Sequence, residues 1–354
     1  MQRVTLHRKF RLFSSLFLAG ILLSPASGLA YDKDTFSSQR KDFIAAEQAL
    51  KRGQIGQYRY LAARLENYPL YPYLKYRRMR RELGRLSNDE VKQFLTENND
   101  SPVSNQLRHA WLRKLARRHD WQTLVDNYYL VKNTRLHCHY SRALFEVGDE
   151  RAVDIATELW LTGKSLPASC DYSFRRLREV GILNDDLVWK RIQLSFYSGR
   201  SRLARYLGKS LPAKDRQLLR LWAKVRRRHQ LLSKVYDLDT DYRPEVVRWI
   251  TVDGIRSMAR KKILEAAKVW LDIRGDYNFQ PEDHQRVERR LIYRLSKSED
   301  EQAQYLFKEL TPVIPDNRMF THYTLSALQD RDWKSALNWM GRLDAIEQQD
   351  PRWR

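Results

Sequence analysis

The residues of this sequence that are best suited to binding are basic. Arginine and lysine outnumber the acidic residues 65 to 43, which gives a formal net charge of +22. Such a chain attracts anionic partners, whether nucleic acid, an acidic polymer or a membrane surface. Four basic clusters lie in segments that read as helices: Arg77-Arg78-Met79-Arg80-Arg81, Arg113-Lys114 with Arg117-Arg118, Arg226-Arg227-Arg228, and Arg260-Lys261-Lys262.

These clusters have two interpretations. Guanidinium groups bind carboxylates with two parallel hydrogen bonds, which suits a carboxylate-bearing polymer. Each cluster is equally consistent with a solvated helix face whose charges pair with acids one turn away. The candidate contact residues are Arg77, Arg78, Arg80, Arg81, Arg226, Arg227 and Arg228.

The acidic residues offer no convincing catalytic site. Cleavage of a glycoside usually needs a pair of carboxylates at a set distance. Each acidic cluster lies at a loop or a helix start, where capping and the helix dipole account for it. The clusters are Asp185-Asp186, Asp237 with Asp239 and Asp241, Glu282-Asp283, and Glu299-Asp300-Glu301. The aspartates around Asp239 lack the glycine and the later glutamate of a calcium loop.

The segment His137-Cys138-His139 raises the question of a metal site. No matching ligand pair lies nearby in sequence, so we expect no metal, and no cofactor motif is present. Cys138 and Cys170 are the two cysteines of the chain. An even count in an exported chain predicts one disulfide, and two buried free thiols are the alternative.

The N-terminus predicts export. Basic residues precede an apolar stretch at residues 12–23, which is too short to cross a bilayer. Small residues at Gly28 and Ala30 fit the two positions that a signal peptidase reads. We therefore predict a signal peptide at residues 1–30, cleavage after Ala30, and no membrane span thereafter; an N-terminal anchor is the alternative. Export also argues against nucleic acid as the partner.

The elements that must carry these residues are helical hairpins. In residues 142–170, Gly148 suits a helix end and Asp149 suits the cap of the next helix. Ala152, Ile155, Ala156, Leu159 and Trp160 then share one face, and Gly163 is expected to end that helix. A hairpin with one apolar stripe per helix needs neighbours of its own kind to cover it.

Similar hairpins recur along the chain, around residues 49–65, 115–128, 194–207 and 327–340. In the last of them the expected stripe is Ala336, Leu337 and Met340. The units are spaced by roughly 27 to 37 residues or about twice that, as in helix-pair solenoids. We predict an all-α fold, a curved α-superhelix (solenoid) of helical hairpin repeats. A non-repeating helical domain is the alternative.

Several segments together resemble one known family. They are Tyr68-Pro-Leu-Tyr-Pro-Tyr-Leu74, Glu158-Leu-Trp-Leu-Thr-Gly-Lys-Ser165, the pair Cys138 and Cys170, and the repeat at residues 333–343 followed by Pro351-Arg352-Trp353. Over most of residues 39–354 the chain resembles the soluble lytic murein transglycosylases of Gram-negative bacteria. The resemblance implies an N-terminal α-superhelix that closes into a ring, followed by a linker domain and a lysozyme-like catalytic domain.

The resemblance also implies a reaction, but it carries over no catalytic residue. A single glutamate in a Glu-Ser motif cleaves the bond between N-acetylmuramic acid and N-acetylglucosamine, leaving a 1,6-anhydro-muramoyl end. This sequence contains neither a Glu-Ser dipeptide nor a Gly-Leu-Met-Gln segment. We therefore expect residues 31–354 to be an α-superhelical murein-binding domain, incomplete at its C-terminal end, with the catalytic domain absent.

The expected function is to bind and position peptidoglycan in the periplasm. Peptidoglycan is the expected partner, with other cell-wall enzymes as further candidates and nucleic acid excluded. The alternative is a periplasmic helical-repeat scaffold that binds a protein partner. A nucleic-acid-binding solenoid fits the charge but contradicts the signal peptide.

Overall fold

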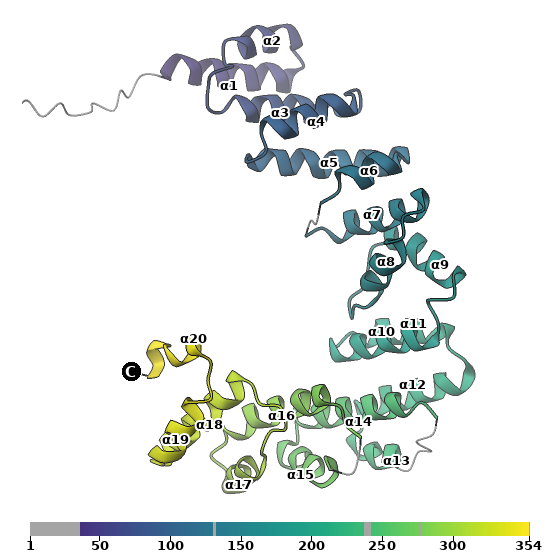
Figure 1. Ribbon diagram of the computed structural model, residues 1–354, viewed down its shortest axis with the longest axis vertical. Coiled ribbons are helices and arrows are strands. Elements are labelled where there is room, and N and C mark those ends of the chain that lie inside the picture. Colours follow the sequence, from purple (N-terminus) through teal and green to yellow (C-terminus); the bar gives the residue numbers. More distant parts are fainter. Residues whose placement is uncertain (1–35, 130–131, 237–241, 276–277, 354) are drawn as a thin grey trace, which may run out of the picture. The chain divides into compact units, whose positions relative to one another are not determined.

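The computed structural model describes residues 36–129, 132–236, 242–275 and 278–353, and every regular element among them is a helix (Figure 1). The predicted all-α class is therefore confirmed. The signal peptide predicted at residues 1–30 lies outside the described residues.

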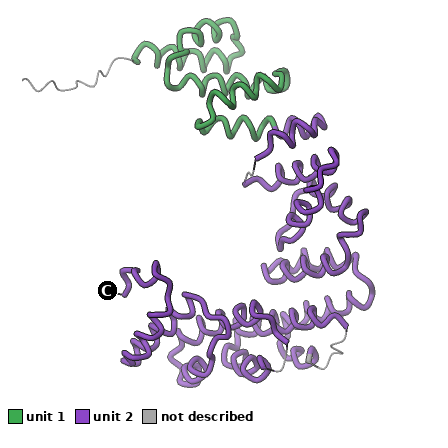
Figure 2. The backbone as a smooth tube through the Cα atoms, in the orientation of Figure 1, with its two compact units in different colours: residues 1–111 green, residues 112–354 purple. Residues whose placement is uncertain are grey.

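The chain divides into two compact units, residues 1–111 and residues 112–354, coloured separately in Figure 2. The boundary falls within one helix, α5. In chain order the elements up to that boundary are α1 (Ser37–Arg52), α2 (Ile55–Ala63), α3 (Tyr71–Glu82), α4 (Asn88–Glu97) and α5 (Pro102–Arg118). The second unit continues with α6 (Trp121–Asn127), α7 (Thr134–Val147), α8 (Ala152–Trp160), η1 (Ala168–Cys170), α9 (Asp171–Glu179), α10 (Asp185–Tyr197), α11 (Ser201–Leu207), η2 (Gly208–Ser210), α12 (Ala213–Val225), η3 (His229–Leu232), α13 (Ser233–Tyr236), α14 (Pro244–Met258), α15 (Ile263–Ile273), α16 (Pro281–Leu295), α17 (Glu301–Glu309), α18 (Asn317–Gln329), α19 (Trp333–Met340), α20 (Ala345–Gln348) and η4 (Pro351–Trp353).

The five hairpins expected from the sequence share one turn. In each hairpin, a residue with a left-handed backbone conformation follows the first helix. The N–H of the residue after it donates to the carbonyl five positions before that donor, at 2.7 to 3.0 Å. This is the Schellman pattern, which satisfies carbonyls at the helix end. Glycine supplies the left-handed residue at Gly53, Gly148 and Gly199, whereas His119 and Arg331 adopt it with φ of 58°.

Three local expectations were wrong. Helix α8 begins at Ala152, and the carboxylate of Asp149 accepts the N–H of Arg151 at 2.9 Å instead of capping the helix. The same helix ends at Trp160, before Gly163. A Cβ on Gly163 would lie 2.3 Å from the carbonyl oxygen of Leu194, so close packing against α10 requires the glycine. Leu337 is 64% exposed and does not join the buried stripe of α19.

In the first unit one core cluster lies between α1, α2 and the start of α3. Tyr58, Leu61, Ala62 and Leu65 are buried there with Ala46 and Ala49, as the spacing of the second helix predicts. The apolar stripe of α2 is thus covered by the helices on either side of it in sequence. Such neighbour-to-neighbour burial is the principle of a helical repeat.

In the second unit, buried tryptophans join successive helices through polar contacts. Each indole N–H donates to a buried carboxylate on a later helix, an arrangement we call the Trp–carboxylate pairs. The pairs are Trp189 with Asp215 at 3.0 Å, Trp222 with Asp253 at 2.9 Å, and Trp270 with Glu288 at 3.3 Å. All three indoles are fully buried, so these tryptophans belong to the core and not to a sugar-binding surface.

Candidate functional site

Cys138 of α7 and Cys170 of η1 form a disulfide, with their Cα atoms 4.7 Å apart and both residues fully buried. The neighbouring His137 is hydrogen-bonded through Nδ1 to the hydroxyl of Tyr128 at 2.7 Å. Burial lowers the pKa of both His137 and His139. In the described ranges no three residues among His, Cys, Asp and Glu are grouped so that they could hold a metal ion.

The first basic cluster lies on α3, in the first unit. Arg77 forms an ion pair with Glu47 of α1 at 2.9 Å, and Arg78 lies 3.9 Å from Glu82 on its own helix. Arg81 donates to the carbonyl of Leu50 at 2.7 Å, at the C-terminal end of α1. Arg80 is exposed. Three members of the cluster thus make contacts within the unit, and two of these tie α3 to α1.

The second basic cluster lies at the end of α12 and contains two kinds of side chain. Arg226 is 11% exposed; its guanidinium pairs with Asp253 and donates to the carbonyl of Phe196 at 2.8 Å. Arg227 and Arg228 are exposed. Arg226 therefore holds the helices of the second unit together, and its two neighbours are the members that face solvent.

Three hollows in the second unit are lined by basic side chains and by no aspartate or glutamate. The Lys209 hollow, of about 340 Å³, lies between α11, η2 and α12, and its basic residues are Arg205, Lys209, Arg216, Arg220 and Lys224. The Arg227 hollow, of about 140 Å³, is lined by Arg205, Arg226, Arg227 and Arg260. The arginine pocket, of about 320 Å³, is lined by Arg256, Arg286, Arg289, Arg290 and Arg318 with Tyr293, Met319 and His322.

These hollows are neighbours. The first two share Arg205 and Ala223 in their linings. Arg260 of the second lies near enough to Arg290 of the third that burial and then this like charge lower the pKa of Arg290. We call the three together the cationic row. It runs over α11, α12, α14, α16 and α18.

Most residues of the cationic row were not identified from the sequence, because only runs of adjacent basic residues were considered there. Only Arg226, Arg227 and Arg260 belong to the four basic clusters identified in the sequence, and the adjacent pair Arg289-Arg290 was not among them. The available signal was helical spacing: Arg286, Arg289 and Arg290 stand at i, i+3 and i+4 and so share one face of α16. Arg216, Arg220 and Lys224 on α12 follow the same rule.

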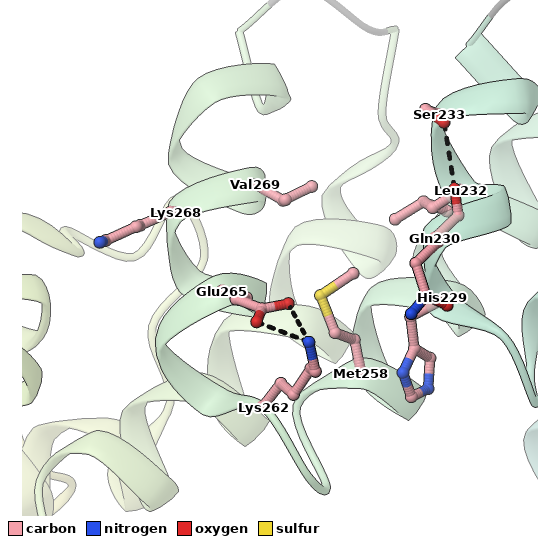
Figure 3. Close-up of a pocket in the computed structure, with 9 residues that line it drawn as sticks. All are labelled: His229, Gln230, Leu232, Ser233, Met258, Lys262, Glu265, Lys268 and Val269. Carbon is pink, nitrogen blue, oxygen red and sulfur yellow. Dashed lines mark hydrogen bonds and ion pairs between the residues drawn. The ribbon is translucent and has the colours of Figure 1, made fainter.

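A fourth hollow, of about 360 Å³, lies between η3 and the helices α14 and α15 (Figure 3). Its single carboxylate, Glu265, is ion-paired with the ammonium of Lys262 at 2.7 Å and is 58% exposed. A general acid for glycoside cleavage needs a carboxyl group held protonated, normally by burial. Burial, followed by Lys261 and Lys262, lowers the pKa of His229 in the same lining. This hollow therefore has the wrong electrostatics for acid catalysis.

The acidic clusters in the described residues lie at helix starts, as expected. Asp185 and Asp186 lie in the first turn of α10. Asp283 accepts the N–H of Gln280 at 3.2 Å and Asp300 accepts that of Ala303 at 2.9 Å. The aspartates around Asp239 that loosely suggested calcium lie outside the described residues.

Comparison with known proteins gives consistent results. No family model matches the chain. The soluble lytic murein transglycosylase of Escherichia coli K12 is 32% identical over 200 residues, which are 56% of this chain and 31% of that protein. The protein of the same name from Salmonella typhimurium LT2 is 32% identical over 182 residues, or 51% of this chain and 28% of its own length.

Solved structures cover more of the chain. An inactive mutant of the lytic transglycosylase Slt from Pseudomonas aeruginosa aligns with a TM-score of 0.76 and 30% identity, over 89% of this chain and 51% of that one. The 70-kDa soluble lytic transglycosylase of E. coli aligns with a TM-score of 0.69 and 25% identity, over 90% of this chain and 52% of that one. This chain thus spans about half the length of those proteins.

The resemblance expected from the sequence is therefore confirmed: the helical region of this chain is similar to that of soluble lytic murein transglycosylases, and the α-superhelix is their fold. In the part of the chain that the structure describes, no helix is both long and apolar enough to cross a membrane.

Proposed function

We propose that this helical chain binds peptidoglycan and positions it for cleavage, the part that a helical region would play in a soluble lytic transglycosylase. The observation that carries the proposal is the cationic row, whose linings contain no carboxylate. The peptides of peptidoglycan bear carboxylates, and the planar guanidinium fork matches a carboxylate with two hydrogen bonds. The glycan supplies no charge, so the row fits the peptide part of the polymer.

We assign binding and not cleavage to the described residues. Cleavage between N-acetylmuramic acid and N-acetylglucosamine with a 1,6-anhydro product is the reaction implied by the family. The buried carboxylates Asp215, Asp253 and Glu288 already accept hydrogen bonds from indoles, and Glu265 is paired with a lysine. The proposal therefore gives no residue here a catalytic role.

Within the predicted basic clusters, we propose murein contacts for Arg77, Arg78, Arg80 and Arg81 on α3 and for Arg226, Arg227 and Arg228 after α12. Arg80, Arg227 and Arg228 are exposed and are best placed to contribute. Arg227 also lines the cationic row. Arg226 and Arg81 already bind acceptors within their own units, so their replacement tests folding as well as binding.

The proposal extends to location. We propose that residues 1–30 act as a signal peptide cleaved after Ala30, and that residues 31–354 work in the periplasm as a murein-binding region. Mass spectrometry of the protein recovered from a periplasmic fraction tests this directly. A mature chain beginning at Tyr31 supports cleavage at the proposed site, and an intact N-terminus in the membrane fraction contradicts it.

The function is tested with residues 31–354 and intact sacculi. Bound protein is measured by pelleting, and released anhydro-muropeptides are measured by mass spectrometry. Binding that weakens as salt is raised, without release of product, supports the proposal, because contacts between exposed charges are screened. Product release would mean that the chain contains a catalytic site that the structure did not suggest.

The alternative function, a scaffold for a protein partner, is favoured by a separate observation. Trp333 and Leu337 of α19 are 62% and 64% exposed, and Ile346 of α20 is 85% exposed. Large exposed apolar side chains are common in protein interfaces. If the chain neither binds sacculi nor releases product, a photo-crosslinking residue at position 337 identifies a protein partner in the periplasm.

A further inference from the structure

The arginine pocket is the part of the cationic row whose basic side chains are all arginines drawn from three different helices. Five guanidinium groups from three helices line a space of about 320 Å³: one from α14, three from α16 and one from α18. Helices α14 and α18 both pack against α16, so the pocket lies across adjacent elements of one unit. Its remaining lining is Tyr293, Met319 and His322.

Little of this charge is neutralised. Arg289 forms an ion pair with Asp316, just before α18. Within the described residues, the other four arginines of the pocket form no ion pair. Burial, followed by the like charge of Arg286, lowers the pKa of Arg256. Like charges held this close repel one another, and a bound anion would relieve that repulsion.

Hydrogen-bonding capacity is also unused in this region. The Nε–H groups of Arg256 and Arg290 are buried and have no hydrogen-bond partner in the described structure. The guanidinium of Arg286 lies 4.3 Å from the ring centroid of Tyr197, and that of Arg256 lies 5.8 Å from it. A buried donor without an acceptor is costly, so the pocket is poorly satisfied when empty.

The chemistry of the pocket selects among anionic groups. Arg318 and Arg286 are exposed, so their forks can reach a carboxylate in solvent, and the exposed ring of Tyr293 offers an apolar surface in the same lining. His322 adds no charge at neutral pH, because burial lowers its pKa. A flexible peptide with a terminal carboxylate and short aliphatic side chains uses both the arginine forks and the ring of Tyr293.

We propose that the arginine pocket binds a carboxylate of a peptidoglycan peptide stem, gripped by the guanidinium groups of Arg286 and Arg318. The inference rests on the proposed function and adds to it the part of the polymer that is recognised. The glycan strand is then held through its peptides, and the sugar rings need no pocket of their own in this region.

The test uses soluble muropeptides with free carboxylates, released from sacculi by a muramidase, and the same muropeptides with their carboxylates amidated. Binding to residues 31–354 is measured by isothermal titration calorimetry. Free muropeptides are expected to bind and amidated ones are not. Inorganic phosphate is the competitor: displacement of muropeptide by equal phosphate concentrations would show a general oxoanion site and overturn the peptide assignment.

Variants locate the binding. R286Q/R318Q is expected to weaken muropeptide binding by about tenfold or more, since it removes two charge-assisted contacts. R286K/R318K keeps the charge but loses the forks and is expected to remain weakened. R175Q/R178Q removes the same charge from exposed arginines of α9, outside the cationic row, and should stay within about twofold of the wild type.

The outcomes separate this inference from the proposed function. If R286Q/R318Q binds muropeptides like the wild type, or if R175Q/R178Q loses as much affinity, the pocket assignment is wrong, whereas sacculus pelleting by the wild type would still support the proposed function. If the wild type does not pellet with sacculi, the proposed function fails. Thermal melting of each variant confirms that the fold is retained.

Discussion

Asp253 is expected to be among the residues on which the stability of the second unit depends most. Its carboxylate accepts from the indole of Trp222 at 2.9 Å and pairs with the guanidinium of Arg226. The two charged side chains are 2% and 11% exposed. Removing one partner of a buried ion pair costs about 3–5 kcal/mol, because the other charge stays buried without compensation.

The substitution Asp253→Asn separates charge from hydrogen bonding. The new side chain keeps an oxygen that can accept from the indole, so the loss comes mainly from the unpaired guanidinium. Arg226 retains the carbonyl of Phe196 as an acceptor at 2.8 Å. We therefore expect the lower end of the range, a decrease of about 3 kcal/mol in the free energy of unfolding of this unit.

The assay is urea unfolding followed by circular dichroism and tryptophan fluorescence, on D253N, R226M and the double variant. Each single variant leaves one charge buried, whereas the double variant leaves none. The double variant should therefore lose at least about 2 kcal/mol less than the sum of the two single losses. The control is E265Q, which breaks an exposed pair and should change stability by about 0.5 kcal/mol or less.

Two results would refute this reasoning. One is a loss below about 1 kcal/mol for D253N, which would mean that water or local movement solvates Arg226. The other is strict additivity in the double variant, which would show that the two side chains do not interact energetically.

Three further predictions concern other parts of the second unit. Replacing Cys138 and Cys170 with serine removes a cross-link over a sequence separation of 32 residues and should lower the free energy of unfolding by roughly 3–4 kcal/mol. The wild type with its disulfide reduced should melt at the same temperature as the variant. A difference between these two melting temperatures would contradict this prediction. Gly163→Ala places a Cβ 2.3 Å from the carbonyl oxygen of Leu194 and should lower the free energy of unfolding, measured with urea, by about 1–3 kcal/mol. An unchanged urea midpoint would show that α10 can shift away from residue 163 without a loss of stability. Burial lowers the pKa of His322, so the unfolded chain binds the proton of this histidine more tightly than the folded chain does. The stability contributed by the neutral ring is therefore present above pH 6.5 and is lost as the pH falls towards the folded pKa. H322Q should reduce the fall in melting temperature between pH 7 and pH 5.5, and an identical fall in the variant and the wild type would count against this prediction.

The turns show what local sequence can and cannot predict. Gly53, Gly148 and Gly199 were predictable because glycine adopts the left-handed conformation without a steric penalty. His119 and Arg331 adopt the same conformation, which is uncommon for any residue other than glycine. Their turns were found only because apolar stripes lie on both sides of them. A histidine or an arginine at such a position is a much weaker signal than a glycine.

The candidate site was less accessible to sequence reasoning. A run such as Arg226-Arg227-Arg228 is visible in the sequence, but consecutive helical residues point in different directions, so one member is buried and two are exposed. The arginine pocket, in contrast, is not visible as a run in the sequence. Arg256, Arg286 and Arg318 are about thirty residues apart, one repeat each. Only the stacking of α14, α16 and α18 brings them together, and no local pattern encodes that stacking.

The Trp–carboxylate pairs have a consequence for how the chain assembles. Hairpins with similar apolar stripes could stack in the wrong order, since a stripe does not distinguish one neighbour from another. Asp215, Asp253 and Glu288 do distinguish them, because each carboxylate is buried only where an indole from an earlier helix meets it. A misordered stack would bury a carboxylate without that donor, at a cost of several kcal/mol. The pairs thus disfavour any arrangement of the helices in which one of these carboxylates is buried without an indole donor.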